Sequence, residues 1–253
     1  MLLAVALWYY LQNSVNRILF EHDEIVDGIA TFGGERAVHV MTVLHGEIGQ
    51  TLKTGEIDGK IGTGKIVGIE NGDSDQVRIS VKCRHDEESL KPWVDLILAP
   101  PRPRVMKRLL PQLASLGVGR LILIGARKVE KDFWGATLLK AENYRPLLLD
   151  GLMQSGTSTM PQLEVRRNLR KFMAEELGTM GGQRIVAHPS KNAVEPECVG
   201  TESVVLAIGP EGGWTDEEVE LFGNHGFRQC SLGPRILRTD TATIALLARL
   251  MPK

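Results

Sequence analysis

Two glycine-rich bends near the carboxyl end constrain the fold of this chain more than any other feature. Before the first bend, Val204–Ile208 is wholly apolar and β-branched at three positions, as expected of a buried strand. Gly209–Gly213 reads GPEGG, a composition that disfavours helix and strand and predicts a loop. Thr215 and Glu218 have the spacing of a capping box, so a helix is predicted to start there. A strand that leads through a glycine-rich loop into a helix is typical of an α/β domain.

The second bend repeats this plan. Gly233-Pro234 interrupts the chain, and Thr239 or Thr241 is placed to cap a last helix from about Ala242 to Met251. Glycines allow a ligand to lie against main-chain N–H and C=O groups, which can read the edge of an adenine. The two bends together predict such a ligand site. For either bend alone, an ordinary strand-to-helix turn is an equally good interpretation.

Composition limits the classes of function. The chain has 253 residues, 43% hydrophobic and 24% charged, which is typical of a globular protein with one large domain or two smaller ones. The formal net charge of -1 gives no global attraction for nucleic acid, so an RNA site must be a local basic patch. Cys83, Cys198 and Cys230 form no CxxC pair, and no HxxxH pattern supplies metal ligands. We therefore expect no metal, and reduced thiols in a cytoplasmic protein.

The first fifteen residues open with the apolar stretch MLLAVALWYYL. This stretch is too short to span a bilayer, and it lacks the basic start and small-residue cleavage site of a secretory signal. A non-native start or a short extension of unknown role is the preferred interpretation of 1–15, and a secretory signal is the alternative.

The remainder divides at Lys91-Pro92. Residues 16–91 hold several short β-type runs and one amphipathic helix, a pattern that suggests a small β-barrel. Within 92–253, the strand 93–99, a helix that ends at Gly117 and the strand 121–124 form a βαβ unit, which predicts a parallel sheet. In such a sheet, ligands bind at the carboxyl ends of the strands.

A cluster of positive charge marks the start of the helix in that βαβ unit. Cations oppose the dipole at the amino end of a helix, so a phosphate partner is a natural explanation for them. A solvated helix face is the alternative. The cluster consists of Arg102, Arg104, Lys107 and Arg108.

The motifs GPEGGW and LGPRILRTDTA resemble the C-terminal signature of the 16S rRNA (uridine-N3) methyltransferase family, a branch of the SPOUT class. The similarity is weaker but continuous back to about Asn16. The resemblance implies a SPOUT α/β domain with a trefoil knot, preceded by a PUA-like RNA-binding β-barrel. It also implies S-adenosylmethionine (SAM) as cofactor, 16S rRNA or the small ribosomal subunit as substrate, and a homodimer, with no membrane partner.

The resemblance also implies the residues of the cofactor site. Main chain after three strands would line it, and the candidates are Ala187, His188, Gly209, Glu211, Gly212, Gly213, Leu232, Gly233, Ile236, Leu237, Thr241 and Ala242. Uridine N3 carries a proton at neutral pH, so a cation near O2 or O4 would stabilise the anion that develops during methylation. Arg238 is the candidate for this role. Asp240 is expected to orient Arg238 by a bidentate pair. The alternative role for Asp240 is that of the general base that removes the N3 proton.

Two further residues are candidate RNA contacts besides the basic cluster. Arg17 lies near the amino end of the matched region. Gln154 belongs to a QSG sequence that resembles a family motif, although Thr157 stands where the family usually has arginine. A turn or capping role is the alternative for Gln154.

The sequence has three alternative interpretations of function. A SPOUT enzyme that acts on a different rRNA or tRNA base keeps the same fold, and a catalytically silent RNA-binding assembly factor would keep only the binding surface. The intact PEGGW and LRTDTA loops argue against a silent factor. A nucleotide-binding α/β enzyme is disfavoured because the chain has no GxxxxGK[ST] and no GxGxxG after a strand.

Overall fold

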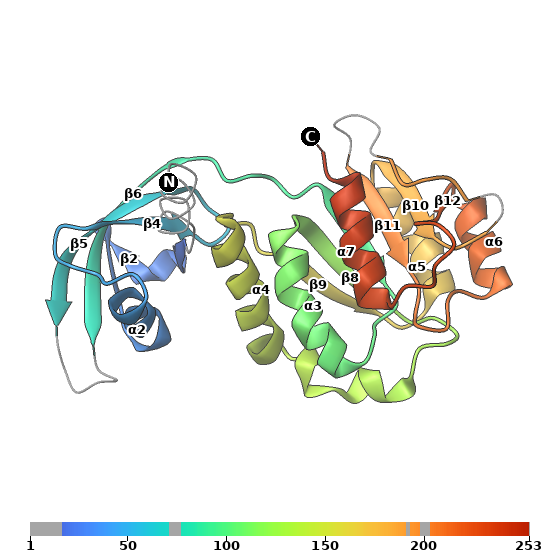
Figure 1. Ribbon diagram of the computed structural model, residues 1–253, viewed down its shortest axis with the longest axis horizontal. Helices are drawn as coiled ribbons and strands as arrows, with labels where there is room; N and C mark the ends of the chain where they lie inside the picture. The colour runs from blue at the N-terminus through green and yellow to red at the C-terminus, as the bar shows by residue number, and fades with distance from the viewer. Residues whose placement is uncertain (1–16, 71–76, 191–192, 198–202, 253) are drawn as a thin grey trace, which may run out of the picture. The chain divides into compact units, whose positions relative to one another are not determined.

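The computed structural model of the chain describes residues 17–70, 77–190, 193–197 and 203–252. It divides into two compact units, one with residues up to 90 together with 152–160, and one with 91–151 and 161 onward (Figure 1). The segment 152–160, expected with the second domain, instead bonds to the first unit. Asp58 N–H donates to the Ser158 carbonyl at 2.9 Å, and Ser158 Oγ donates to the Gly59 carbonyl at 2.6 Å. The extension 1–15 and Asn16 lie outside the described residues.

The first unit is a six-stranded sheet with the order β1-β4-β5-β6-β3-β2. β1 pairs with β4 in parallel and all other pairs are antiparallel. Within the described residues no ladder joins the edge strands β1 and β2. The strands are β1 (Ile18–Phe20), β2 (Ile25–Val26), β3 (Ile29–Phe32), β4 (Thr51–Glu56), β5 (Ile61–Glu70) and β6 (Arg78–Glu87), with a 3-10 turn at His22–Glu24.

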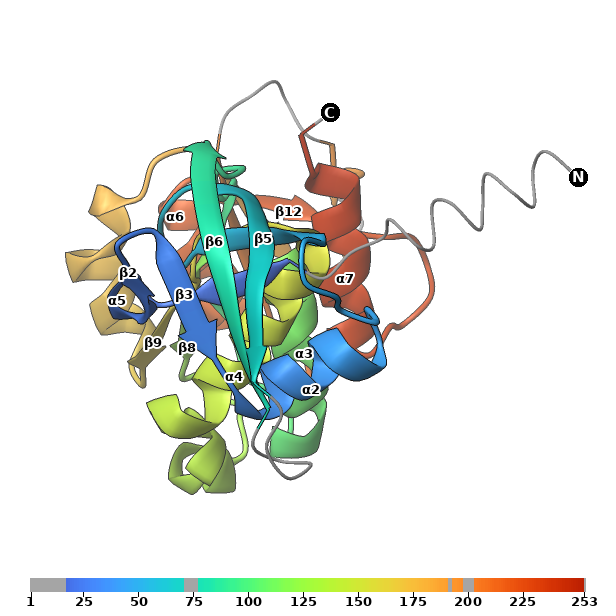
Figure 2. The same ribbon diagram turned by 90° about the vertical axis from the view of Figure 1, so that its left-hand side faces the viewer.

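One helix, α2 (Gly34–Thr42), packs on this sheet (Figure 2). Its buried residues Ala37 and Val40 join a core that includes Phe20, Phe32 and Ile66 from the strands. The short β-type runs and the amphipathic helix of the sequence are therefore present, and burial of their apolar faces stabilises the unit.

The second unit is a wholly parallel sheet with the order β12-β10-β11-β7-β8-β9. The predicted βαβ unit and the predicted strand Val204–Ile208 are both confirmed. All five residues of that strand are buried, because helices cover both faces of a parallel sheet. The strands are β7 (Val94–Leu98), β8 (Val118–Ile124), β9 (Gln162–Arg166), β10 (Gln183–Ala187), β11 (Val204–Ile208) and β12 (Arg228–Cys230).

Two layers of helices enclose this sheet. α5 (Leu169–Glu175) and α6 (Asp216–Asn224) bury Phe172 and Phe222 in a core shared with Ile97 and Val205. α3 (Pro103–Ser115) and α7 (Thr239–Leu250) lie side by side on the face toward the viewer of Figure 1. The remaining elements are α4 (Ala141–Ser155) and 3-10 turns at Lys131–Gly135, Thr137–Leu139 and Leu177–Thr179. Among the described residues, no helix is both long enough and apolar enough to cross a membrane.

Candidate functional site

The carboxyl ends of β10, β11 and β12 meet at one edge of the parallel sheet. Ala187, the last residue of β10, is in register with Ile208 of β11 and with Cys230 of β12. The segments that begin at His188, Gly209 and Ser231 therefore all leave the sheet at this edge. These are the segments in which the sequence placed the ligand site, and such an edge is where open α/β sheets bind ligands.

Two residues that follow β10, His188 and Val194, bond to opposite sides of β12. His188 N–H donates to the Cys230 carbonyl at 3.0 Å on the side that faces β10. On the opposite side, Val194 N–H donates to the Gln229 carbonyl at 3.1 Å, and Ser231 N–H donates to the Val194 carbonyl at 3.0 Å. Successive residues of a strand direct their backbone groups to opposite sides, which explains this alternation. The strand β12 is thus held between β10 and Val194.

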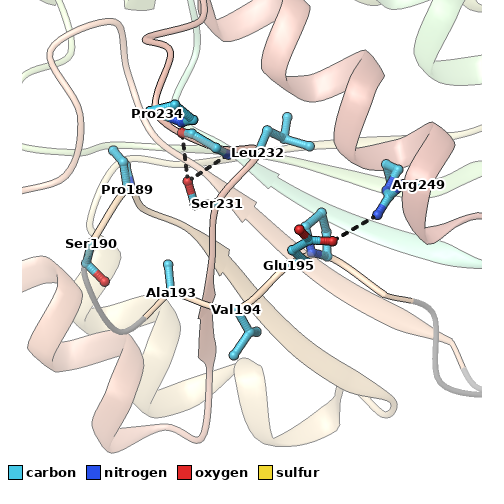
Figure 3. A pocket seen from close by; sticks show the side chains of 11 residues that line it. Pro189, Ser190, Ala193, Val194, Glu195, Ser231, Leu232, Pro234 and Arg249 are labelled. Atoms are coloured by element: carbon cyan, nitrogen blue, oxygen red, sulfur yellow. Dashed lines mark hydrogen bonds and ion pairs between the residues drawn. The ribbon is translucent and has the colours of Figure 1, made fainter.

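A cavity of about 850 Å³ lies between the segment that follows β10 and the segment that follows β12 (Figure 3). Two of the predicted cofactor residues, Leu232 and Gly233, line it, and Ala187 and His188 immediately precede its wall at Pro189. Gly233 has φ +101° and no atom within 4 Å of the position where a side chain would begin, so the main chain is open there. The lining comprises Pro189, Ser190, Ala193, Val194, Glu195, Pro196, Ser231, Leu232, Gly233, Pro234 and Arg249.

The cavity has an ion pair that sequence analysis missed. Glu195 Oε2 lies 3.5 Å from an Arg249 guanidinium nitrogen, and both side chains are more than half exposed. Glu195 follows β10 and Arg249 is near the end of α7, so no local pattern connects them. A pair this exposed contributes little to stability. The pair places one negative and one positive side chain, Glu195 and Arg249, in the lining of the cavity.

The first glycine-rich loop follows β11, the strand beside β10, and does not line this cavity. The predicted cofactor residues Gly209, Glu211, Gly212 and Gly213 all lie on that loop. A side chain at Gly209 would begin 3.1 Å from Trp214 Nε1, so glycine permits the buried indole to pack against the loop. Gly213 has φ +70° and open space in front of it, as Gly233 has.

The segment after β8 holds this loop in place. Lys128 Nζ donates to the Gly212 carbonyl at 2.8 Å. The predicted capping box is confirmed, because Thr215 N–H donates to Glu218 Oε2 at 2.8 Å and Glu218 N–H donates to Thr215 Oγ1 at 3.3 Å. The same Glu218 carboxylate accepts from Arg127 N–H at 2.8 Å. Neither the Arg127 nor the Lys128 contact is predictable from local sequence, since both join residues more than eighty positions apart.

Loss of the Glu218 carboxylate is expected to destabilise the start of α6 and its contact with the segment after β8. Glu218→Ala removes acceptors from two main-chain N–H groups, and we expect it to lower the free energy of unfolding by about 1–2 kcal/mol. Glu217→Ala is the matched control in the same helical turn. Its carboxylate only meets Arg170 at 3.4 Å with both groups exposed, so a change within about 0.5 kcal/mol is expected. Urea unfolding measures both, and equal losses would contradict the assigned role of Glu218.

The second bend continues from the cavity into α7. Ile236 is 98% exposed and Leu237 is 37% exposed, so this chain leaves the first of these predicted cofactor residues uncovered and the second partly covered. The predicted cap at Thr239 or Thr241 is wrong. α7 begins at Thr239, three residues before the predicted start at Ala242, and the N-cap is Arg238, which makes no side-chain capping bond. Thr239 is instead buried, and its carbonyl accepts from Thr243 Oγ1 at 2.7 Å.

The expected pair of Arg238 with Asp240 is also wrong. Asp240 Oδ2 lies 3.6 Å from the Arg108 guanidinium of α3, and Asp240 Oδ1 accepts from Thr241 N–H at 2.9 Å. Residues two positions apart at a helix start do not face each other, whereas α3 and α7 pack side by side. Arg238 is exposed, and among the described residues it has no acidic partner. Asp240 therefore joins two helices rather than orienting Arg238.

The predicted RNA contacts fall into different settings. Arg102 pairs with Glu130 at 3.1 Å and Arg108 with Asp240, while Arg104 and Lys107 are exposed. Arg17 belongs to the first unit, where its guanidinium donates to the carbonyls of Thr54 at 2.6 Å and of Gly62 and Gly156 at 2.9 Å. Burial lowers the Arg17 pKa. Arg17 therefore holds backbone segments together, and Gln154 is exposed near the end of α4.

Cys230 at the end of β12 is beside the cavity without lining it. Burial raises the pKa of its thiol to about 11, so the thiol is neutral at physiological pH and is not poised as a nucleophile. Cys83 and Cys230 are both free thiols, as predicted, and Cys198 lies outside the described residues.

Comparison with known proteins identifies the family. The model of the RNA methyltransferase domain family matches residues 88–251. A ribosomal RNA small subunit methyltransferase E from Treponema pallidum is 31% identical over 242 residues, covering 92% of this chain and 90% of that protein. A Legionella pneumophila methyltransferase solved with SAM bound has a TM-score of 0.72 and 28% identity, covering 93% and 96% of the two chains. A Neisseria gonorrhoeae small subunit methyltransferase E shares the fold, with a TM-score of 0.69 and 20% identity over 92% and 95%. The chain belongs to the RNA methyltransferase family, together with the small subunit methyltransferases E.

Proposed function

We propose that this protein is a SAM-dependent methyltransferase that modifies N3 of a uridine in the 16S rRNA of the small ribosomal subunit. The observation that carries the proposal is the cavity lined by the second glycine-rich bend and by the segment after β10, at the carboxyl edge of the parallel sheet. Full-length similarity to a protein named as a small subunit rRNA methyltransferase supports the RNA class. The N3 position rests on the GPEGGW and LGPRILRTDTA motifs.

The residues at this edge fit SAM. A volume of about 850 Å³ is within the range of small-molecule sites, about 300–1,000 Å³. Pro189, Val194 and Leu232 offer apolar walls for an adenine, and the open main chain at Gly233 offers N–H and C=O groups to its edge. Gly213 of the neighbouring loop has the same open backbone. The loops Ala187–His188, Gly209–Gly213 and Leu232–Leu237 would then surround the cofactor.

SAM supplies a methyl group that its sulfonium already activates, so the protein contributes mainly position and electrostatics. The uridine must be unpaired for its N3 to be reached, and the N3 proton must leave. Arg238 stands at the end of the second bend with a free guanidinium, which suits it to bind O2 or O4 as negative charge develops there. Asp240, paired with Arg108, links the start of α7, next to Arg238, to α3.

The proposal includes a trefoil knot, a PUA-like first domain and a homodimer. The bonds that His188 and Val194 make to opposite sides of β12 support a trefoil knot, and the sheet of the first unit supports a PUA-like RNA-binding domain. The exposed Ile236 and Leu237 support a homodimer that covers them. An enzyme with this substrate would act in the cytoplasm. We assign 16–91 to the RNA-binding domain and 92–253 to the methyltransferase domain, with 152–160 packed on the former.

Methyl transfer to defined RNA tests this proposal. The protein would be incubated with labelled SAM and small subunits that lack the modification, and the product mapped by mass spectrometry. The expected product is one methyl group at N3 of a single uridine in 16S rRNA. Label on another base would reassign the target, and the absence of label in every RNA tested, with no SAM binding by calorimetry, would identify a silent assembly factor.

A further inference from the structure

The four basic residues at the start of α3 divide into two pairs with different surroundings. Arg102 and Arg108 each have an acidic partner, Glu130 and Asp240. Arg104 and Lys107 make no ion pair or hydrogen bond with any residue that the structure describes, and both side chains are exposed. A cluster that appears uniform in the sequence therefore contains two cations engaged within the fold and two that are available.

The two available cations line the same hollow. It has a volume of about 360 Å³ and lies between the first turns of α3, the 3-10 turn Thr137–Leu139 and the first turn of α4. Thr137 and Asn143 bring a hydroxyl and an amide to it, and Asn143 Nδ2 is held by donating to the Thr137 carbonyl at 2.8 Å. Among the described residues that line it, none is acidic. They are Pro103, Arg104, Lys107, Thr137, Leu138 and Asn143.

The charges in this hollow are unfavourable without a ligand. Arg104 and Lys107 are three positions apart, so their like charges are neighbours on the helix. Both also lie near the amino end of α3, where the helix dipole disfavours cations. An anion seated between them would relieve both effects. A phosphate has the charge and the several acceptor oxygens that a guanidinium, an ammonium, a hydroxyl and an amide together can satisfy.

We propose that Arg104 and Lys107 bind a backbone phosphate of the substrate RNA in this hollow, with Thr137 and Asn143 as its polar walls, while Arg102 and Arg108 stay paired with Glu130 and Asp240. This inference rests on the proposed function, because it assigns a contact to the RNA substrate of that reaction. It narrows the basic cluster from four candidate contacts to two. It also adds two residues that carry no charge and that sequence analysis did not consider.

The salt dependence of RNA binding tests this assignment with a matched control from the same cluster. Affinity for an unmodified 16S rRNA transcript would be measured from low to moderate salt. The double variant Arg104→Gln/Lys107→Gln is expected to bind about tenfold more weakly at low salt and to lower the slope of log K against log salt by about one to two. Arg102→Gln/Arg108→Gln removes the same charge, yet its slope is expected to change by less than about half a unit. Equal slopes for the two double variants would overturn the assignment.

Two readouts separate this inference from the proposed function. Phosphate contacts carry no base sequence, so an unrelated RNA of equal length should show the same loss of slope. That loss would support the hollow even if the wild-type protein transferred no methyl group to 16S rRNA. The SAM affinity of Arg104→Gln/Lys107→Gln should match that of the wild type. A loss of SAM affinity with an unchanged RNA slope would place the cofactor's carboxylate in the hollow and refute the RNA contact.

Discussion

Replacement of Arg238 by alanine is expected to reduce methyl transfer about a hundredfold or more and to leave the Kd for SAM within about tenfold of the wild-type value. The structural reason is that Arg238 is exposed at the N-cap of α7 and does not line the cavity beside the bends. Its guanidinium has no partner among the described residues and is available to the uridine. Single-turnover methylation and calorimetric titration with SAM measure the two quantities.

Arg238→Lys serves as the control for this result. It keeps the positive charge but loses the planar, five-donor guanidinium, so an intermediate rate is expected if charge at O2 or O4 is what matters. An alanine variant with full activity would remove Arg238 from the reaction. Parallel losses of rate and SAM affinity would place it in cofactor binding or folding.

Gly151→Ala is expected to lower the free energy of unfolding by about 3 kcal/mol, although alanine normally favours a helix over glycine. Gly151 lies inside α4 where that helix approaches α3. A side chain there would begin 2.0 Å from the Pro111 carbonyl oxygen, which is backbone and cannot rotate away. The two helices would have to separate, and the packing of Leu148 against the core would be lost. Urea or thermal unfolding measures the change.

Gly223→Ala is the matched control for that substitution. Gly223 lies in α6, with no atom within 4 Å of the position where its side chain would begin, so only helix propensity changes. An increase in the free energy of unfolding of up to about 1 kcal/mol is expected. If both glycine variants shifted stability in the same direction, the close approach of α3 and α4 would be contradicted.

Short-range patterns predicted the parts of the fold that depend on neighbours in sequence. The apolar run at 204–208 and the Thr215–Glu218 capping box both follow from local chemistry, and the structure contains both. The parallel sheet followed from strand, helix and strand in succession, since a crossover helix requires it. The sequence also predicted that the segments after β10, β11 and β12 leave the sheet at one edge, and a cavity lies there.

The contacts that were not predicted join residues that are far apart in sequence. Asp240 forms an ion pair with Arg108 of α3 and not with Arg238, which is two positions away in sequence. Lys128, in the segment after β8, donates a hydrogen bond to the Gly212 carbonyl. The helix α7 also starts earlier than its threonines suggested, because Thr239 is buried rather than exposed as a cap would be. Tertiary packing determined each of these contacts and the start of α7, and local sequence patterns carry no information about such packing.

A crystal structure of the protein grown with SAM tests the central claim most directly. The account predicts that the adenosine lies at the carboxyl ends of β10 and β12, between Pro189 and Leu232, with main-chain bonds to the second bend. The methyl group would then point toward the side on which Arg238 stands. SAM bound at any other place, with this cavity empty, would contradict the account.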